Sequence, residues 1–140
     1  MIVLDTNVLS ELLRPVPSPH VVRWMEGQPL SSLFATTITQ AEMLYGIEAM
    51  PKGKRRDALQ REIRAMFTQD FANRILPFDV EAAQAYPGIA AARRALGRPI
   101  SPLDAQIAAI ASSRGAKLAT RNIADFEHCG VALVDPWKIR

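Results

Sequence analysis

Cysteine and histidine are scarce in this chain of 140 residues, which has one cysteine and two histidines. The single Cys129 excludes an internal disulfide framework, and paired Cys or His ligands for zinc are absent. No apolar run approaches the roughly 20 residues that a membrane span needs. The first residues, Met-Ile-Val-Leu-Asp, lack the basic region of a signal peptide. We therefore expect a cytoplasmic protein that has no membrane partner.

Glycine-rich phosphate loops and the His-Glu-x-x-His motif are also missing. About half of the residues are apolar, and the length is typical of one domain. We therefore expect residues 1–140 to form a single globular domain. Its bases gather at positions 52–56, 93–98 and 114–121. Such clusters favour a polyanionic partner, because phosphate contacts supply most of the affinity for nucleic acid. Solvated helix faces are the other explanation for them.

Short apolar runs alternate with longer helical patterns along the chain. They predict strands at 2–4, 33–36, 75–78, 117–120 and 131–134, and helices at 8–13, from 19, at 37–50, 52–67, 79–96 and 102–115. Pro77 places the third strand at a sheet edge, and Pro87 is expected to break or kink its helix. This alternation predicts an α/β fold with a parallel sheet, in which ligands bind at the carboxyl ends of the strands.

Carboxylates from four separate segments fall at that edge. Asp5 follows the first strand, and Glu42 lies in the first turns of the helix after the second. Asp104 begins the helix before the fourth strand, and Asp125 follows that strand. Clustered carboxylates repel one another, so a fold tolerates them chiefly when a hard cation compensates. Oxygen ligands without His or Cys indicate Mg²⁺ or Mn²⁺.

Three of these acids also have an explanation that needs no metal. Glu42 stands three residues after Thr39, which is the spacing of a capping box, where the acid bonds the backbone of its own helix start. Asp104 has the same relation to Ser101. Asp125 is equally explained as a surface acid. Asp5 is harder to explain by capping alone, because it ends a buried strand.

Four segments resemble the signature segments of PIN-domain proteins: residues 4–9, 38–46, 103–109 and 119–126. Their order and spacing fit over essentially the whole chain. The likeness is strongest to the VapC toxins of bacterial type II toxin–antitoxin systems, particularly the FitB-like branch. Ser10-Glu11 and the closing Asp135-Pro136-Trp137 are similar to that branch as well.

This resemblance implies a PIN-like three-layer α/β/α sandwich with a central, mostly parallel sheet of about five strands. It implies an endoribonuclease dependent on Mg²⁺, or on Mn²⁺, that acts as the toxin of a type II pair and hydrolyses RNA. A cognate antitoxin with a DNA-binding domain would neutralise it, and a homodimer is the usual assembly.

By the family pattern, Asp5 and Asp104 would be metal ligands and Glu42 would complete the acidic pocket. Thr6, Asn7 and Thr120 would orient Asp5 and the substrate. The fourth position is open, because many relatives carry an acid directly after Thr-Arg, where this chain has Asn122. Either Asp125 substitutes for that acid or Asn122 binds water on the metal.

Phosphodiester hydrolysis needs charge neutralised on the phosphate and a nucleophilic water, and a carboxylate-held Mg²⁺ supplies both. We predict that Asp5 and Asp104 hold the metal and that Glu42 or Asp125 positions the attacking water. Two other functions stay open. One is a non-enzymatic PIN-fold partner in an operator-DNA-binding complex. The other is a DNA nuclease, because nothing in the sequence recognisably reads a 2′-hydroxyl.

Overall fold

The fold is built on a five-stranded parallel sheet. A computed structural model describes residues 1–139, and its strands are β1 (Ile2–Leu4), β2 (Leu33–Thr36), β3 (Ile75–Leu76), β4 (Lys117–Ala119) and β5 (Leu133–Val134). They lie in the order β3-β2-β1-β4-β5, and every neighbouring pair is parallel. The predicted parallel sheet is confirmed, with β3 at an edge. Because β1 is central, its carboxyl end delivers Asp5 to the middle of the sheet edge.

Nine helical segments surround the sheet in the described part of the chain. They are α1 (Thr6–Leu12), α2 (Pro19–Glu26), η1 (Leu30–Ser32), α3 (Thr37–Glu48), α4 (Lys54–Ala65), η2 (Met66–Asp70), α5 (Val80–Ala95), α6 (Pro102–Ser113) and α7 (Ile123–Phe126). Within residues 1–139, none of them has the length and apolar character to cross a membrane.

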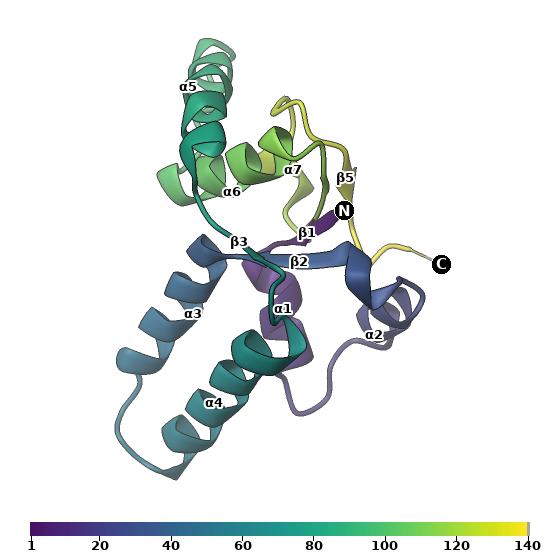
Figure 1. Ribbon diagram of the computed structural model, residues 1–140, viewed down its shortest axis with the longest axis vertical. Coiled ribbons are helices and arrows are strands. Elements are labelled where there is room, and N and C mark those ends of the chain that lie inside the picture. The colour runs from purple at the N-terminus through teal and green to yellow at the C-terminus, as the bar shows by residue number, and fades with distance from the viewer. Residues whose placement is uncertain (140) are drawn as a thin grey trace.

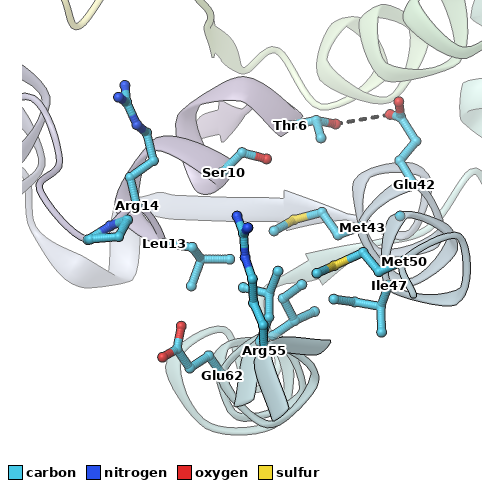
Figure 2. Close-up of a pocket in the computed structure, with 14 residues that line it drawn as sticks. Thr6, Ser10, Leu13, Arg14, Glu42, Met43, Ile47, Met50, Arg55 and Glu62 are labelled. Atoms are coloured by element: carbon cyan, nitrogen blue, oxygen red, sulfur yellow. Dashed lines mark hydrogen bonds between the residues drawn. The ribbon is translucent and has the colours of Figure 1, made fainter. Parts of the chain in front are cut away.

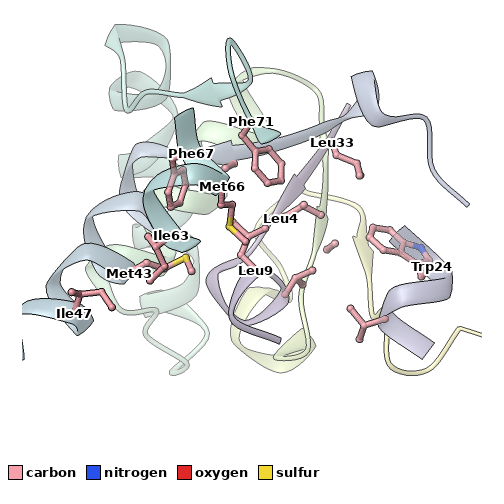
Figure 3. Packing of buried hydrophobic residues seen from close by; sticks show 14 residues of the cluster. Leu4, Leu9, Trp24, Leu33, Met43, Ile47, Ile63, Met66, Phe67 and Phe71 are labelled. Atoms are coloured by element: carbon pink, nitrogen blue, oxygen red, sulfur yellow. The ribbon is translucent and has the colours of Figure 1, made fainter. Parts of the chain in front are cut away.

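Helices cover both faces of the sheet, which confirms the three-layer arrangement (Figure 1). Successive residues of a strand point to opposite faces, and β1 shows this directly. Leu4 packs in a cluster formed with α1 to α4, whereas Val3 packs in a second cluster formed with α5 and α6. Figure 3 shows the first cluster, which extends from Ile47 at one end to Trp24 at the other. Both faces are therefore apolar, as a parallel sheet between two helical layers requires.

Two predicted helices differ from the structure for identifiable reasons. The helix predicted at 52–67 begins at Lys54, and its regular part ends at Ala65. A wider turn follows, in which the Phe71 N–H bonds the Met66 carbonyl at 2.9 Å and Phe71 enters the core. Helix α5, in contrast, runs unbroken through Pro87. Pro87 and Ala83 are both exposed, so water can satisfy the carbonyl that the proline leaves free.

Candidate active site

Asp5 is held in one orientation by groups from β4 and α1. One carboxylate oxygen accepts the Thr6 N–H at 2.8 Å and so caps α1. The other accepts the Thr120 hydroxyl at 2.8 Å and the Asn7 amide at 3.2 Å. The side chain is only 5% exposed. One oxygen of Asp5 therefore caps α1, and the side chains of Thr120 and Asn7 hold the other oxygen in place.

The pKa of Asp5 is raised from its ordinary value of 3.8 to about 6. Burial is the main cause, hydrogen bonds from Thr120 and Thr6 oppose it, and the charges of Asp104 and Glu42 add to it. The carboxylates from three distant segments are thus close enough to repel one another. A group in this environment gains from a cation that neutralises it. The electrostatics of the pocket are those of an anionic site that a metal would stabilise.

Glu42 faces Asp5 through Thr6 rather than capping its own helix. The Thr6 hydroxyl donates to Glu42 Oε1 at 2.9 Å (Figure 2) and lies 3.0 Å from the Thr39 hydroxyl. The cap of α3 is Thr36, whose hydroxyl accepts the Thr39 N–H. The alternative explanation of Glu42 as part of a capping box with Thr39 is therefore wrong, because the helix begins earlier and Glu42 lies in its second turn.

Asp104 acts electrostatically on both Asp5 and its other acidic neighbour, Asp125. The Ser101 hydroxyl caps α6 by accepting the Asp104 N–H at 3.2 Å, as the sequence suggested, and the Asp104 side chain stays half-buried. Burial raises its pKa, opposed by a hydrogen bond from Ser101; the charge of Asp125 raises it further, and Arg93 lowers it. Asp125 is exposed, yet its charge reaches Asp104. Asp125 is thus electrostatically coupled to Asp104, and its role in the site stays a prediction.

The remaining predicted residues form a polar network around Asp5. The Asn7 amide also donates to the Thr120 hydroxyl at 3.3 Å, and its oxygen accepts the Arg121 N–H at 3.3 Å. Asn122 joins through its backbone, whose N–H donates to Thr120 at 3.0 Å. The structure therefore brings Thr6, Asn7 and Thr120 into contact with the acids, whereas the Asn122 side chain lies exposed. Their functional roles stay predictions.

The donor set suits Mg²⁺. In the part of the chain that the structure describes, no three His, Cys, Asp or Glu side chains converge as a ready metal cluster. Mg²⁺ does not require one, because it binds through one or two carboxylates and keeps several waters. A buried, fixed Asp5 opposite Asp104, with oxygen donors only, fits that coordination chemistry. Asp5 and Asp104 are the residues that would hold the ion.

Arg93 is a residue of this site that the sequence did not reveal. The prediction placed it in a basic surface cluster, but it is only 4% exposed. Its guanidinium donates to the carbonyls of Asp125 at 2.6 Å, Glu127 at 3.1 Å and Arg98 at 2.7 Å. It thereby fixes α7, which carries Asp125. The sequence does contain one indication of this burial. Arg93 comes four residues after Ile89, which is buried, so both side chains lie on one face of α5.

We expect Arg93→Met to destabilise the fold by about 2–3 kcal/mol, because three partly buried backbone carbonyls lose their charged donor. The change in free energy of unfolding is measured by urea denaturation. Hydrogen exchange should speed up over α7 before it does so in the sheet. Arg94→Met is the matched control, since Arg94 is the exposed neighbour on the same helix. Equal stability of the two variants would contradict this role.

Beside Glu42, the surface is hollowed into a groove of about 590 Å³ between α1, α3 and α4. Its walls are largely apolar, from Leu13, Met43, Ile47, Met50, Leu59 and Ile63. Arg14 and Arg55 project at its rim, as Figure 2 shows. The groove begins at Thr6 and Glu42, so whatever occupies it lies next to the acidic pocket.

The chain is similar to proteins that are named as nucleases and toxins. The PIN domain family matches residues 2–130. The chain is 44% identical to the plasmid stability protein StbB of Pseudomonas syringae and 39% identical to the VapC ribonuclease Y4jK of Sinorhizobium fredii, over 99% of all three chains. It is 37% identical to the toxin FitB of Neisseria gonorrhoeae, over 98% of this chain and 99% of that one.

A solved structure agrees along the whole chain. The structure of FitAB bound to an IR36 DNA fragment superposes with a TM-score of 0.93 at 37% identity, covering 100% of this chain and 98% of that one. The fold, the acidic pocket at the sheet edge and relatives of such identity over nearly the full length lead to one assignment. This chain belongs to the PIN-domain family.

Proposed function

We propose that this protein is a metal-dependent endoribonuclease and that it acts as the toxin of a type II toxin–antitoxin pair. The observation that carries the proposal is the buried Asp5, held rigidly at the end of β1 and surrounded by the charges of Asp104 and Glu42. Its relatives named as a VapC ribonuclease and as a toxin support the same reading. Mg²⁺, or Mn²⁺, is the expected cofactor.

Mg²⁺ at Asp5 and Asp104 would supply charge neutralisation on the scissile phosphate and a more acidic water. The chain's own groups do the rest. Thr120 and Asn7 hold the Asp5 oxygen in one place, which keeps the reacting groups aligned. Glu42, oriented by the Thr6 hydroxyl, is in our proposal the base that takes the proton of the attacking water. Asp125, held through its backbone by Arg93, adds negative charge beside Asp104.

An antitoxin with a DNA-binding domain is the proposed partner. The solved FitAB relative is a complex bound to DNA, which supports a partner of that kind. The apolar groove beside Glu42 is the surface that we expect the antitoxin to cover, because an occupant there obstructs the acidic pocket. The toxin itself is proposed to be a homodimer, which the mass of the purified chain in solution would test.

The DNA-bound FitAB relative also favours a second candidate function, that of a partner in an operator-DNA-binding complex. That function needs neither the acids nor a metal. It is compatible with catalysis by the same chain, so the question is whether the isolated protein cleaves RNA.

The test incubates the purified full chain and Mg²⁺ with single-stranded RNA and with DNA of the same sequence. We expect cleavage of the RNA only, and inhibition when the antitoxin encoded beside the gene is added. Equal cleavage of the DNA would instead identify a DNA nuclease. If neither is cut, while the complex with the antitoxin binds operator DNA, the non-enzymatic function is the correct one.

A further inference from the structure

We propose that Arg121 is a substrate-binding residue, and that it holds a phosphate of the RNA beside the acidic pocket from a platform formed by Trp137. This inference rests on the proposed ribonuclease function and adds a phosphate-binding position to it. The evidence is the attachment of Arg121 to the Asp5 network, the free charge of its guanidinium and the rigid support beneath it.

Arg121 is tied to the residues that orient Asp5. It directly follows Thr120, whose hydroxyl donates to Asp5 at 2.8 Å. The Arg121 N–H donates to Asn7 Oδ1 at 3.3 Å. The Arg121 backbone is therefore linked to Asp5 in two ways, through the adjacent Thr120 and through its hydrogen bond to Asn7. In our proposal, a phosphate that flanks the one at Asp5 reaches this side chain.

The guanidinium of Arg121 stacks on an aromatic ring instead of pairing with an acid. Its central carbon lies 5.1 Å from the centre of the Trp137 ring, a cation–π distance. The side chain is exposed, and it makes no ion pair within residues 1–139. Stacking uses one face of the planar group and leaves its edge N–H groups free, and that edge is the part that binds phosphate with two parallel hydrogen bonds.

Trp137 is a rigid platform because it is held at three points. Its side chain packs partly buried against the α1–α4 cluster. Its indole lies close enough to the Glu11 carboxylate to help lower the pKa of that group, and its backbone N–H donates to Asp135 Oδ1 at 2.9 Å. Glu11 is itself buried, with only 5% exposed, and accepts the Ser18 N–H at 3.1 Å. An arginine on such a support loses little further freedom when it binds a ligand, which favours affinity.

Several other arginines are already committed. Arg98 pairs with Glu127, Arg14 pairs with Glu11, and Arg114 pairs with Asp79. Arg93 is buried on backbone carbonyls. Arg121 combines exposure, a free charge and attachment to the Asp5 network, and this combination singles it out as the phosphate contact.

The test measures steady-state cleavage and RNA binding by Arg121→Gln. We expect KM to rise about tenfold, the factor for losing one charge-assisted contact, with kcat changed far less, because Arg121 lies away from the reacting atoms. In EDTA, where cleavage stops, affinity for a labelled RNA oligomer should show a slope against log salt that is smaller by about 0.7, the value for one phosphate on a single strand.

Three further variants separate binding from folding. Arg121→Lys keeps the charge but not the planar fork, so its KM should fall between those of the wild type and Arg121→Gln. Trp137→Phe keeps a ring under the arginine and should raise KM less than Arg121→Gln does. Arg64→Gln removes an exposed charge from the far end of α4 and should leave KM and the salt slope unchanged. Thermal denaturation checks that each variant is folded.

The inference is overturned if Arg121→Gln has the KM and the salt slope of a wild type that cleaves RNA. It is also overturned if Arg64→Gln loses as much affinity, because the effect would then be one of net charge. If the wild type binds RNA but does not cleave it, the proposed function fails instead, and the salt slope of Arg121→Gln still decides the phosphate contact.

Discussion

Asp5→Asn abolishes RNA cleavage, with an expected loss of about 10³-fold or more, the scale seen when a member of a catalytic set is removed. Asparagine keeps the size of the side chain and one oxygen for the Thr6 N–H, but it removes the charge that would hold Mg²⁺. Single-turnover cleavage with excess enzyme measures the effect. Asp70→Asn is the control, since Asp70 is an exposed acid beyond α4 and its loss should leave the rate unchanged.

The Asp5→Asn protein should remain folded. The substitution removes a buried charge that the fold disfavours at neutral pH. Against this, the new amide group faces two donors, the Thr120 hydroxyl and the Asn7 amide, so the gain in stability is small. We expect a melting temperature within a few degrees of the wild type. Cleavage within a few-fold of the wild-type rate would refute the metal site centred on Asp5.

We expect chelation of divalent cations to stop cleavage completely and Mg²⁺ or Mn²⁺ to restore it. The effect of the metal on the stability of the protein should depend on pH, because Asp5 titrates. The folded pKa of about 6 lies above the ordinary 3.8. Without metal, the folded state therefore binds the extra proton, and the contribution of Asp5 to stability is greatest below about pH 4. It declines as the pH rises toward 6 and is level above that, a loss of at most about 3 kcal/mol.

Mg²⁺ competes with that proton, so it should raise the melting temperature at pH 7.5 and have little effect at pH 5. Scanning calorimetry with Mg²⁺ and with EDTA at both values makes the comparison without any substrate. Asp5→Asn serves as the control, because it should lose both the decline in stability and the response to Mg²⁺. An equal Mg²⁺ effect at the two pH values, or full activity in EDTA, would rule out Asp5 as the titrating ligand.

Local sequence patterns predicted much of the fold. Alternating apolar runs and helical periodicities placed the five strands in their correct order along the chain, because burial on a parallel sheet demands continuous apolar residues. They also placed Asp5 and Glu42 at the carboxyl edge. The short helix α7 was not predicted, since four residues are too few to show a helical period.

What the sequence by itself determined is the identity and the chain order of the acids, since residue type and spacing are local properties. Only the tertiary structure decided which groups each acid meets. Several threonines near α3 are possible caps, and packing selected Thr36, which freed Glu42 to meet Thr6. Arg93 became a buried support for Asp125, 32 residues away along the chain. Such contacts depend on how distant segments pack, and a local sequence pattern contains no information about that packing.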